Sequence, residues 1–168
     1  MKISLFVGDI TDVQADAVCT STNPRLSLMM GTGGAVRERG GFQVLRECEK
    51  LTGGHTLPAG SAFLTTGGAL PFKAVIHCVA SDTSHRSSTE IVRLCVRNAL
   101  ERADCAGCKT VAMPVFGSGH AHVRFDQALT AMRDILLNAN TGVEHVVVVV
   151  YDQDRADDAR RILEPLPN

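Results

Sequence analysis

Residues 2–41 contain three polar segments whose side chains and backbone groups can hold a nucleotide. They are Gly8-Asp9-Ile10-Thr11, the stretch Thr20-Ser21-Thr22-Asn23, and the glycine cluster Gly31-Thr32-Gly33-Gly34. A carboxylate accepts a hydrogen bond from the amino group of a base, an amide bonds sugar hydroxyls, and free backbone N–H groups bind phosphate. These segments predict a site for a ligand that contains a base, phosphates and a sugar.

A second glycine loop follows the apolar run Thr110–Val115 and Phe116. It reads Gly117-Ser118-Gly119-His120-Ala121-His122. Glycine lets a backbone pass close to a ligand and turn its N–H groups toward it. A tight strand-to-helix turn would explain these glycines alone, but two such loops in one domain favour a pyrophosphate held from both sides. Because imidazole exchanges protons near neutral pH, His120 is a candidate for proton transfer or phosphate contact, and His122 for ligand contact unless it points the other way.

Neither of the two common nucleotide-binding motifs is present. Gly31-x-Gly33-x-x-Val36 lacks the last glycine of a dinucleotide fingerprint and lies away from the preceding strand, and the chain has no Gly-Lys-Ser or Gly-Lys-Thr ending of a P-loop. A lone histidine inside an apolar run, His77, is interpreted as structural.

The elements that must position these loops alternate between strand and helix patterns. Strand-length apolar runs are Ile3–Val7, Ala15–Cys19, Ala62–Thr65, Ala74–Val79, Thr110–Val115 and His145–Tyr151. Helical patterns cover 34–40, 42–50, 88–104 (with a Ser87-x-x-Glu90 capping box), 124–138 and 155–163 (with Asp154 as a possible cap). This alternation predicts one three-layer α/β/α domain over residues 1–168, with a mostly parallel six-stranded sheet and ligand loops at the carboxyl ends of the strands.

Composition narrows the class of protein. The 168 residues are 45% apolar and 21% charged with a net charge of −1, so the chain lacks the basic excess of a protein held to nucleic acid by many phosphates. We therefore expect no sequence-specific nucleic-acid binding, and we expect a monomer. The N-terminus has no signal-peptide layout and no apolar run approaches the length of a membrane span, which predicts a cytoplasmic protein without a membrane partner.

The six cysteines are interpreted as reduced core residues. Cys105-Ala-Gly-Cys108 is a C-x-x-C segment, but no second pair and no histidine spacing completes a zinc site. No metal and no cofactor are predicted.

The order of these segments resembles the Macro domain family. Gly8–Thr11 resembles the opening GDIT of that family, Ala15–Asn23 its VDAIVNAAN segment, and Leu26 with Gly31–Val36 its L…GGGVAGAI loop. Gly60–Thr65 with Leu70–His77, Pro114–His122, and Tyr151-Asp152 resemble its later motifs, so the resemblance runs from about residue 3 to 163.

The resemblance implies that the protein binds ADP-ribose. Asp9 and the Ile10 N–H would then bond the adenine, Tyr151 would pack on its face, the glycine loops would wrap the pyrophosphate and distal ribose, and Asn23 would bond that ribose. The ligand-binding residues implied are Asp9, Ile10, Asn23, Gly31, Thr32, Gly33, Gly34, Val36, Phe116, Gly117, Ser118, Gly119, His120, Ala121, His122, Tyr151 and Asp152.

The same resemblance implies hydrolysis of mono-ADP-ribosyl groups from modified protein or nucleic-acid ends, but the chain departs from the hydrolytic pattern. Gly33 stands where family members that remove ADP-ribose from acidic side chains usually carry an Asp, Thr20 replaces the first Asn of NAAN, and Thr32 stands where Val or a similar residue is common. Catalysis would then rely on the substrate's own phosphate, with Asn23 and His120 as the catalytic residues. The alternatives are a non-catalytic reader of ADP-ribose, a phosphatase acting on ADP-ribose 1″-phosphate, and a protein with this fold but no nucleotide function.

Overall fold

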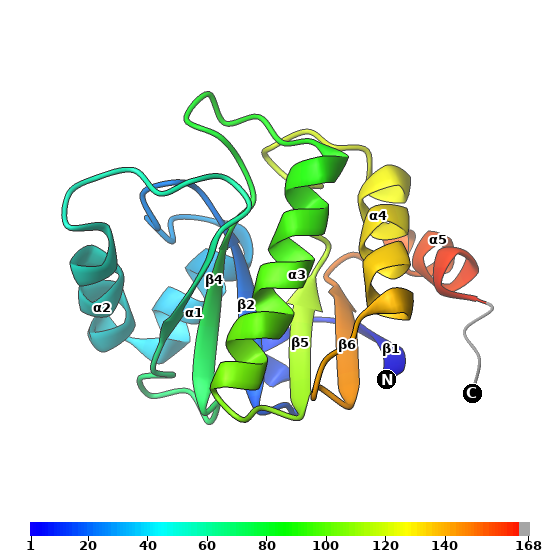
Figure 1. Cartoon of the computed structure of the whole chain (residues 1–168), viewed down its shortest axis with the longest axis horizontal. Coiled ribbons are helices and arrows are strands. Elements are labelled where there is room, and N and C mark those ends of the chain that lie inside the picture. Colours follow the sequence, from blue (N-terminus) through cyan, green and yellow to red (C-terminus); the bar gives the residue numbers. More distant parts are fainter. Residues whose placement is uncertain (165–168) are drawn as a thin grey trace.

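The predicted apolar runs pair into one mixed sheet within residues 1–164, the part of the chain that this computed structural model describes (Figure 1). The strands lie in the order β1-β6-β5-β2-β4-β3, and every pair is parallel except β3 with β4. Their bounds are β1 Lys2–Val7, β2 Ala17–Thr22, β3 Ala62–Thr65, β4 Ala74–Val79, β5 Thr110–Pro114 and β6 His145–Val150. The parallel strands place their carboxyl ends along one edge, as the predicted site requires.

Helices cover both faces of the sheet and bury its alternating side chains. One core joins the sheet to α3 (Thr89–Cys105), α4 (Phe125–Asn138) and α5 (Gln153–Leu163), and it contains Ala17 and Cys19 of β2. The other contains Val18 and joins the opposite face to the short 3₁₀ helix η1 (Ile10–Asp12), α1 (Gly31–Gly40) and α2 (Phe42–Thr52). Successive residues of β2 thus point to opposite faces, as strand geometry demands. The three-layer α/β/α prediction is confirmed.

The bounds of β2 differ most from the prediction. The strand was expected over Ala15–Cys19 but starts at Ala17 and includes the polar Thr20-Ser21-Thr22, which pairs with β4. The buried hydroxyl of Thr20 is satisfied by the Nδ1 atom of His77, 3.0 Å away. Since β-branched threonine suits a strand and its hydroxyl has a partner, its polarity does not end the strand.

Two predicted helix caps move by one or two residues. Ser88, not Ser87, is the N-cap of α3, and its hydroxyl accepts a hydrogen bond from the Ile91 N–H at 3.2 Å. Asp152, not Asp154, is the N-cap of α5, without a side-chain cap bond. All six cysteines are free thiols, and five are buried, but Cys105 is exposed, which corrects the prediction that places it in the core. No helix within residues 1–164 is long and apolar enough to cross a membrane.

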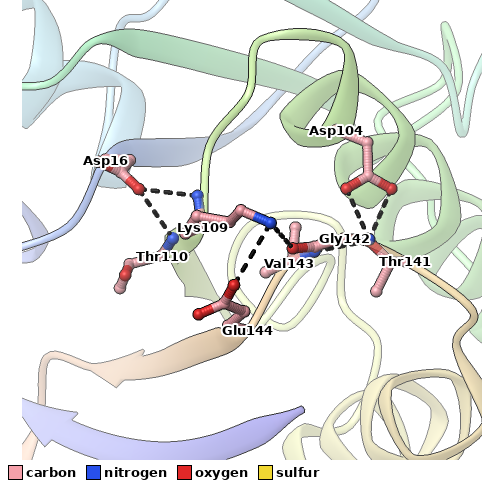
Figure 2. A network of polar contacts seen from close by, with 8 residues as sticks. All are labelled: Asp16, Asp104, Lys109, Thr110, Thr141, Gly142, Val143 and Glu144. Atoms are coloured by element: carbon pink, nitrogen blue, oxygen red, sulfur yellow. Dashed lines mark hydrogen bonds and ion pairs between the residues drawn. The ribbon is translucent and has the colours of Figure 1, made fainter.

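A polar network joins the amino ends of β2, β5 and β6, opposite the predicted site (Figure 2). The Asp16 carboxylate accepts hydrogen bonds from the backbone N–H groups of Lys109 and Thr110, at 2.7 and 3.1 Å. Asp104 accepts one from the Gly142 N–H at 2.9 Å, and the Lys109 ammonium donates to the Gly142 carbonyl at 3.0 Å. These bonds hold three connecting loops together at the end of the sheet that has no ligand loops.

Candidate functional site

A cavity of about 570 Å³ opens at the carboxyl ends of four parallel strands, β2, β4, β5 and β6. Every segment that follows one of these strands contributes to its walls. Ten of the predicted ligand residues line it: Asn23, Gly31, Thr32, Gly117, Ser118, Gly119, His120, Ala121, Tyr151 and Asp152. The structure therefore brings both glycine loops, the amide and the aromatic residue to one cavity.

The other predicted ligand residues lie outside the cavity lining: Asp9, Ile10, Gly33, Gly34, Val36, Phe116 and His122. The side chains of Ile10, Val36 and Phe116 are buried in the two cores, so these residues could meet a ligand only through their backbones. His122 is exposed beyond the rim with φ +63°, and its N–H donates to the Gly119 carbonyl at 3.2 Å. That turn directs the loop away after Ala121.

Asp9 is the N-cap of the short helix η1. Its Oδ1 accepts hydrogen bonds from the backbone N–H and the hydroxyl of Thr11, at 2.8 and 2.5 Å, while Oδ2 lies 3.8 Å from the Arg39 guanidinium. Burial raises the pKa of Asp9, but the Thr11 hydrogen bonds and the Arg39 charge together lower it by more than burial raises it. The pKa of Asp9 is therefore below its usual value. The side chain is 28% exposed and carries its charge at neutral pH, which leaves Oδ2 able to accept from a ligand.

Asn23 shapes the loop that enters the first glycine cluster. Its Oδ1 accepts from the N–H groups of Arg25 and Ser27, at 3.0 and 3.4 Å, and its Nδ2 donates to the Ser27 hydroxyl at 2.5 Å. Leu26 and Leu28 adopt φ values of +50° and +47°, a region that branched side chains rarely occupy, yet both side chains are buried. Packing thus holds a strained path beside the cavity.

The glycine cluster forms the first turn of α1. Gly31 and Thr32 line the cavity, and no side chain caps this helix, so its N-terminal N–H groups suit an anion. Thr32 accepts the Ser21 N–H on its hydroxyl at 3.0 Å, which ties α1 to β2. Gly33 is buried, and an added Cβ would lie 3.1 Å from Leu28 Cα and 3.2 Å from its Cδ2. Position 33 therefore packs against the loop rather than facing the cavity.

Hydrogen bonds and a contact with Ser87 hold the second glycine loop in place. Gly117 adopts φ +71°, and an added Cβ would lie 2.9 Å from the Ser87 hydroxyl oxygen. The Val123 N–H donates to the Gly117 carbonyl at 3.0 Å, and the Ser118 hydroxyl donates to the Val115 carbonyl at 2.8 Å. These bonds present Ser118, Gly119 and the exposed His120 along the cavity wall.

The β6 end of the cavity is aromatic and basic. Tyr151 follows β6 and is 77% exposed, so its ring is free to stack on a base. The Arg155 guanidinium lies 5.1 Å from the centre of the Phe125 ring, and both residues line the cavity. Such a cation–π contact fixes the position of the positive charge.

Sequence reasoning missed several lining residues. They are Ser21, Thr22, Ser27, Leu28, Met29, Met30, Ala80, Ser81, His85, Pro114, Val115, Phe125, Val149, Val150 and Arg155. The sequence could have indicated Ala80, Ser81 and His85, because they follow a predicted strand as the two glycine loops do. Their segment has no glycine, so it was not recognised as a ligand loop. Arg155 and Phe125 come from two helices, and no spacing in the sequence pairs them.

His77 lies outside the cavity and is a buried structural residue, as predicted. Its ring nitrogens contact the hydroxyls of Thr20 and Thr65, at 3.0 and 2.9 Å, and burial lowers its pKa to about 4. Within residues 1–164, no group of three or more His, Cys, Asp or Glu side chains is arranged to hold a metal ion.

Comparisons with known proteins agree with this geometry. The family model described as Macro domain matches residues 19–132. A Macro domain-containing protein of Streptomyces coelicolor is 36% identical over 156 residues, which cover 89% of this chain and 91% of that protein. One from Streptomyces nogalater is 35% identical over 167 residues, covering 96% and 91%.

Solved structures share the fold. A variant of the Oceanobacillus iheyensis macrodomain with ADPR has a TM-score of 0.88 at 23% identity, covering 95% of this chain and 90% of that one. The Trypanosoma brucei macrodomain in complex with ADP-ribose has a TM-score of 0.83 at 23% identity, covering 95% and 68%. At these identities the likeness is one of fold.

Proposed function

Because the chain belongs to the Macro domain family, we propose that it binds ADP-ribose in the cavity at the carboxyl ends of β2, β4, β5 and β6. The observation that carries the proposal is that two glycine loops, from segments after different strands, line one cavity with Tyr151 at one end. A solved macrodomain of this fold is in complex with ADP-ribose, which supports the same ligand here.

The proposed pose follows the order of the strands. Adenine lies at the β6 end, stacked on Tyr151, with Asp9 after the neighbouring β1 as acceptor for its amino group. The pyrophosphate lies between the first turn of α1 and the Gly117–Ala121 segment, whose N–H groups suit its charge. The distal ribose then reaches the β2 end, where Asn23 keeps one Nδ2 proton free for a ribose hydroxyl.

We further propose that the protein hydrolyses mono-ADP-ribosyl groups from modified protein or nucleic-acid ends. Gly33 cannot position a water, so the substrate's own phosphate holds and activates it, Asn23 orients the ribose, and His120 assists proton transfer. Water attacks C1″ of the distal ribose and the bond from C1″ to the modified group breaks. The support for His120 is its exposed position on the cavity wall, beside the phosphate-binding segment.

A non-catalytic ADP-ribose reader is the second candidate. One observation favours it: position 33 has no carboxylate to position a water, and an added Cβ there would be in tight contact with Leu28, at 3.1 Å from its Cα. Turnover separates the two functions directly.

The test combines calorimetry with turnover. Wild-type protein should bind ADP-ribose and release it from mono-ADP-ribosylated peptides or nucleic-acid ends. His120→Asn should slow release by about 10²-fold, the usual contribution of a general acid or base, while the dissociation constant rises by less than about tenfold. His122→Asn is the matched control, since that residue lies outside the lining and Asn tolerates its positive φ, and its rate should stay within about twofold.

Each negative result has its own meaning. No binding of ADP-ribose would refute the proposed ligand. Binding without turnover on every substrate would establish the reader. An unchanged rate in His120→Asn would remove His120 from the mechanism.

A further inference from the structure

The loop between β4 and α3 extends beyond the carboxyl end of β4 (Figure 1) and contributes a second histidine to the cavity lining. That residue is His85, which lines the cavity together with Ala80 and Ser81. In the sheet, β4 lies beside β2 and is separated from β6 by β5 and β2. His85 follows β4 and Asn23 follows the neighbouring β2, whereas Tyr151 follows β6, two strands from β2.

This loop has a defined shape. The Asp82 carboxylate accepts hydrogen bonds from the N–H groups of Ser84 and Arg86, at 2.8 and 3.0 Å. The Asp82 N–H donates to the Arg86 carbonyl at 2.8 Å, and the His85 N–H donates to the Asp82 carbonyl at 3.1 Å. His85 itself is held at φ +59°. A non-glycine residue kept in that region by its surroundings is a common feature of functional sites.

The loop is also tied to the second glycine loop. The Ser87 N–H donates to the Ala121 carbonyl at 3.1 Å, and the backbone of Gly117 packs on the Ser87 side chain. His85 and His120 thus reach one cavity from two loops that are bonded to each other.

The other titratable residues of the lining lie elsewhere. Tyr151, Asp152 and Arg155 all follow β6, at the proposed adenine end. Within the described residues, His85 and His120 are the lining side chains that can give a proton near the distal ribose. His120 extends from the phosphate-binding loop, whereas His85 comes from the loop after β4, next to the β2 end where the proposed pose puts the distal ribose.

We propose that His85 is a catalytic residue that protonates the leaving oxygen, and that the preferred substrates are ADP-ribosyl groups linked through a hydroxyl, such as a serine side chain. This proposal rests on the hydrolytic function proposed above. Water forms the new bond to C1″, and the C1″–O bond breaks with its electron pair moving to the leaving oxygen, which takes the proton of His85. The substrate phosphate, assisted by His120 as proposed above, accepts the proton lost by the water. His85, exposed at the rim, regains a proton from solvent.

The linkage preference follows from the chemistry of the leaving group. A carboxylate leaves as a stable anion and needs little help from an acid, whereas an alkoxide is strongly basic and needs its proton as the bond breaks. A donor at this end of the cavity therefore accelerates hydroxyl-linked substrates most.

The test compares two mono-ADP-ribosylated peptides, one linked through serine and one through glutamate. His85→Asn keeps a residue that tolerates positive φ, and Ser84→Ala in the same loop is the control. We expect His85→Asn to lower kcat on the serine-linked peptide by about 10²-fold and to lower the serine-to-glutamate rate ratio by at least about tenfold.

Three results would overturn the proposal: equal losses on both peptides, an unchanged rate on the serine-linked peptide, or a wild type that does not cleave that peptide. Calorimetry with free ADP-ribose and cleavage of the glutamate-linked peptide by the wild type are measured alongside. If both persist, only the role of His85 has failed. If the wild type cleaves neither peptide, the hydrolytic function has failed with it.

Discussion

Asp9 caps the helix η1, and it is also the proposed acceptor for the adenine amino group. A test of ligand recognition must separate these two roles. Its Oδ1 is occupied by two hydrogen bonds from Thr11, and its Oδ2 faces Arg39 at 3.8 Å. Truncation to alanine removes both oxygens at once, so a loss of affinity in that variant has two explanations. Asparagine keeps an acceptor for the Thr11 N–H and removes the charge.

We therefore expect Asp9→Asn to weaken binding of ADP-ribose and of AMP by about 1–2 kcal/mol, because a charged acceptor for the adenine amino group is lost. Binding of ribose 5-phosphate should hardly change, and the free energy of unfolding should stay within about 0.5 kcal/mol. Asp9→Ala should add a loss of about 1 kcal/mol in stability from the missing cap. Calorimetry with the three ligands checks this, and equal losses for all three would place Asp9 outside the adenine site.

At the scale of elements, the two loops over the cavity meet where Gly117 packs on Ser87. Gly117 adopts φ +71°, and an added Cβ would come within 2.9 Å of the Ser87 hydroxyl oxygen and 3.2 Å of Val92 Cγ2. Gly119, two residues later, has open space around it. The pair offers a matched comparison.

Gly117→Ala should lower the free energy of unfolding by about 1–3 kcal/mol and weaken ADP-ribose binding, because backbone strain and the contact with Ser87 shift both loops. Gly119→Ala should leave stability within about 0.5 kcal/mol. Urea denaturation of both variants measures the difference. Equal stabilities would mean that the loops are not braced at Gly117.

Strands β2, β3 and β4 share a buried histidine that makes stability depend on pH. The pKa of His77 falls from 6.5 to about 4 through burial, so the folded state keeps the ring neutral between the bonds to Thr20 and Thr65. Above about pH 6.5 both folded and unfolded states are neutral, and the full contribution is present. Between 6.5 and 4 the unfolded state binds a proton that the folded state does not, so stability falls.

The loss attributable to His77 should approach about 3 kcal/mol by pH 4. His77→Gln cannot titrate but can still bond both threonines, so it serves as the control. Denaturant unfolding of both proteins from pH 7.5 to 4.5 should give a steeper decline for the wild type. Parallel curves would contradict the depressed pKa of His77.

The order of elements could be predicted because each apolar run ends in polar or glycine residues, and the helical stripes lie between them. The end of β2 could not, since the strand continues through Thr20 only because His77 of a distant strand satisfies its hydroxyl. Both glycine loops and Asn23 could be predicted, because the spacing of these residues along the sequence identifies them. The Arg155–Phe125 pair reaches the cavity through a tertiary contact, for which no short segment carries a signal, whereas His85 follows a strand in a segment that has no glycine.

Across the whole molecule, the polar network at the amino ends of the strands is separate from the cavity (Figure 2). The hydrogen bond from Lys73, with those from the Lys109 and Thr110 N–H groups, lowers the pKa of Asp16 more than its partial burial raises it. At pH values above the usual pKa of an aspartate, the Asp16 carboxylate is charged and its full contribution to stability is present. That contribution is lost as the pH falls through the lower pKa that Asp16 has in the folded state.

Asp16→Asn should lower the free energy of unfolding at pH 7 by about 1–2 kcal/mol, since charged hydrogen bonds become neutral ones. Affinity for ADP-ribose should stay within about twofold. Glu144→Gln is the control, because that carboxylate is 73% exposed and its ion pair with Lys109 should contribute less than about 0.5 kcal/mol. Denaturation and calorimetry on the same samples measure both quantities. A change in affinity without a change in stability would contradict the separation of the two ends.

The packing of Gly33 on Leu28 limits the substitutions that position 33 accepts. Any side chain at position 33 would place its Cβ 3.1 Å from the Leu28 Cα, so the 26–28 backbone must first move by a few tenths of an ångström. The cost of a carboxylate at position 33 therefore depends on how readily the backbone of Leu28 moves. Because residues 28 and 33 are in contact, we expect the effects of substitutions at the two positions on stability to be non-additive.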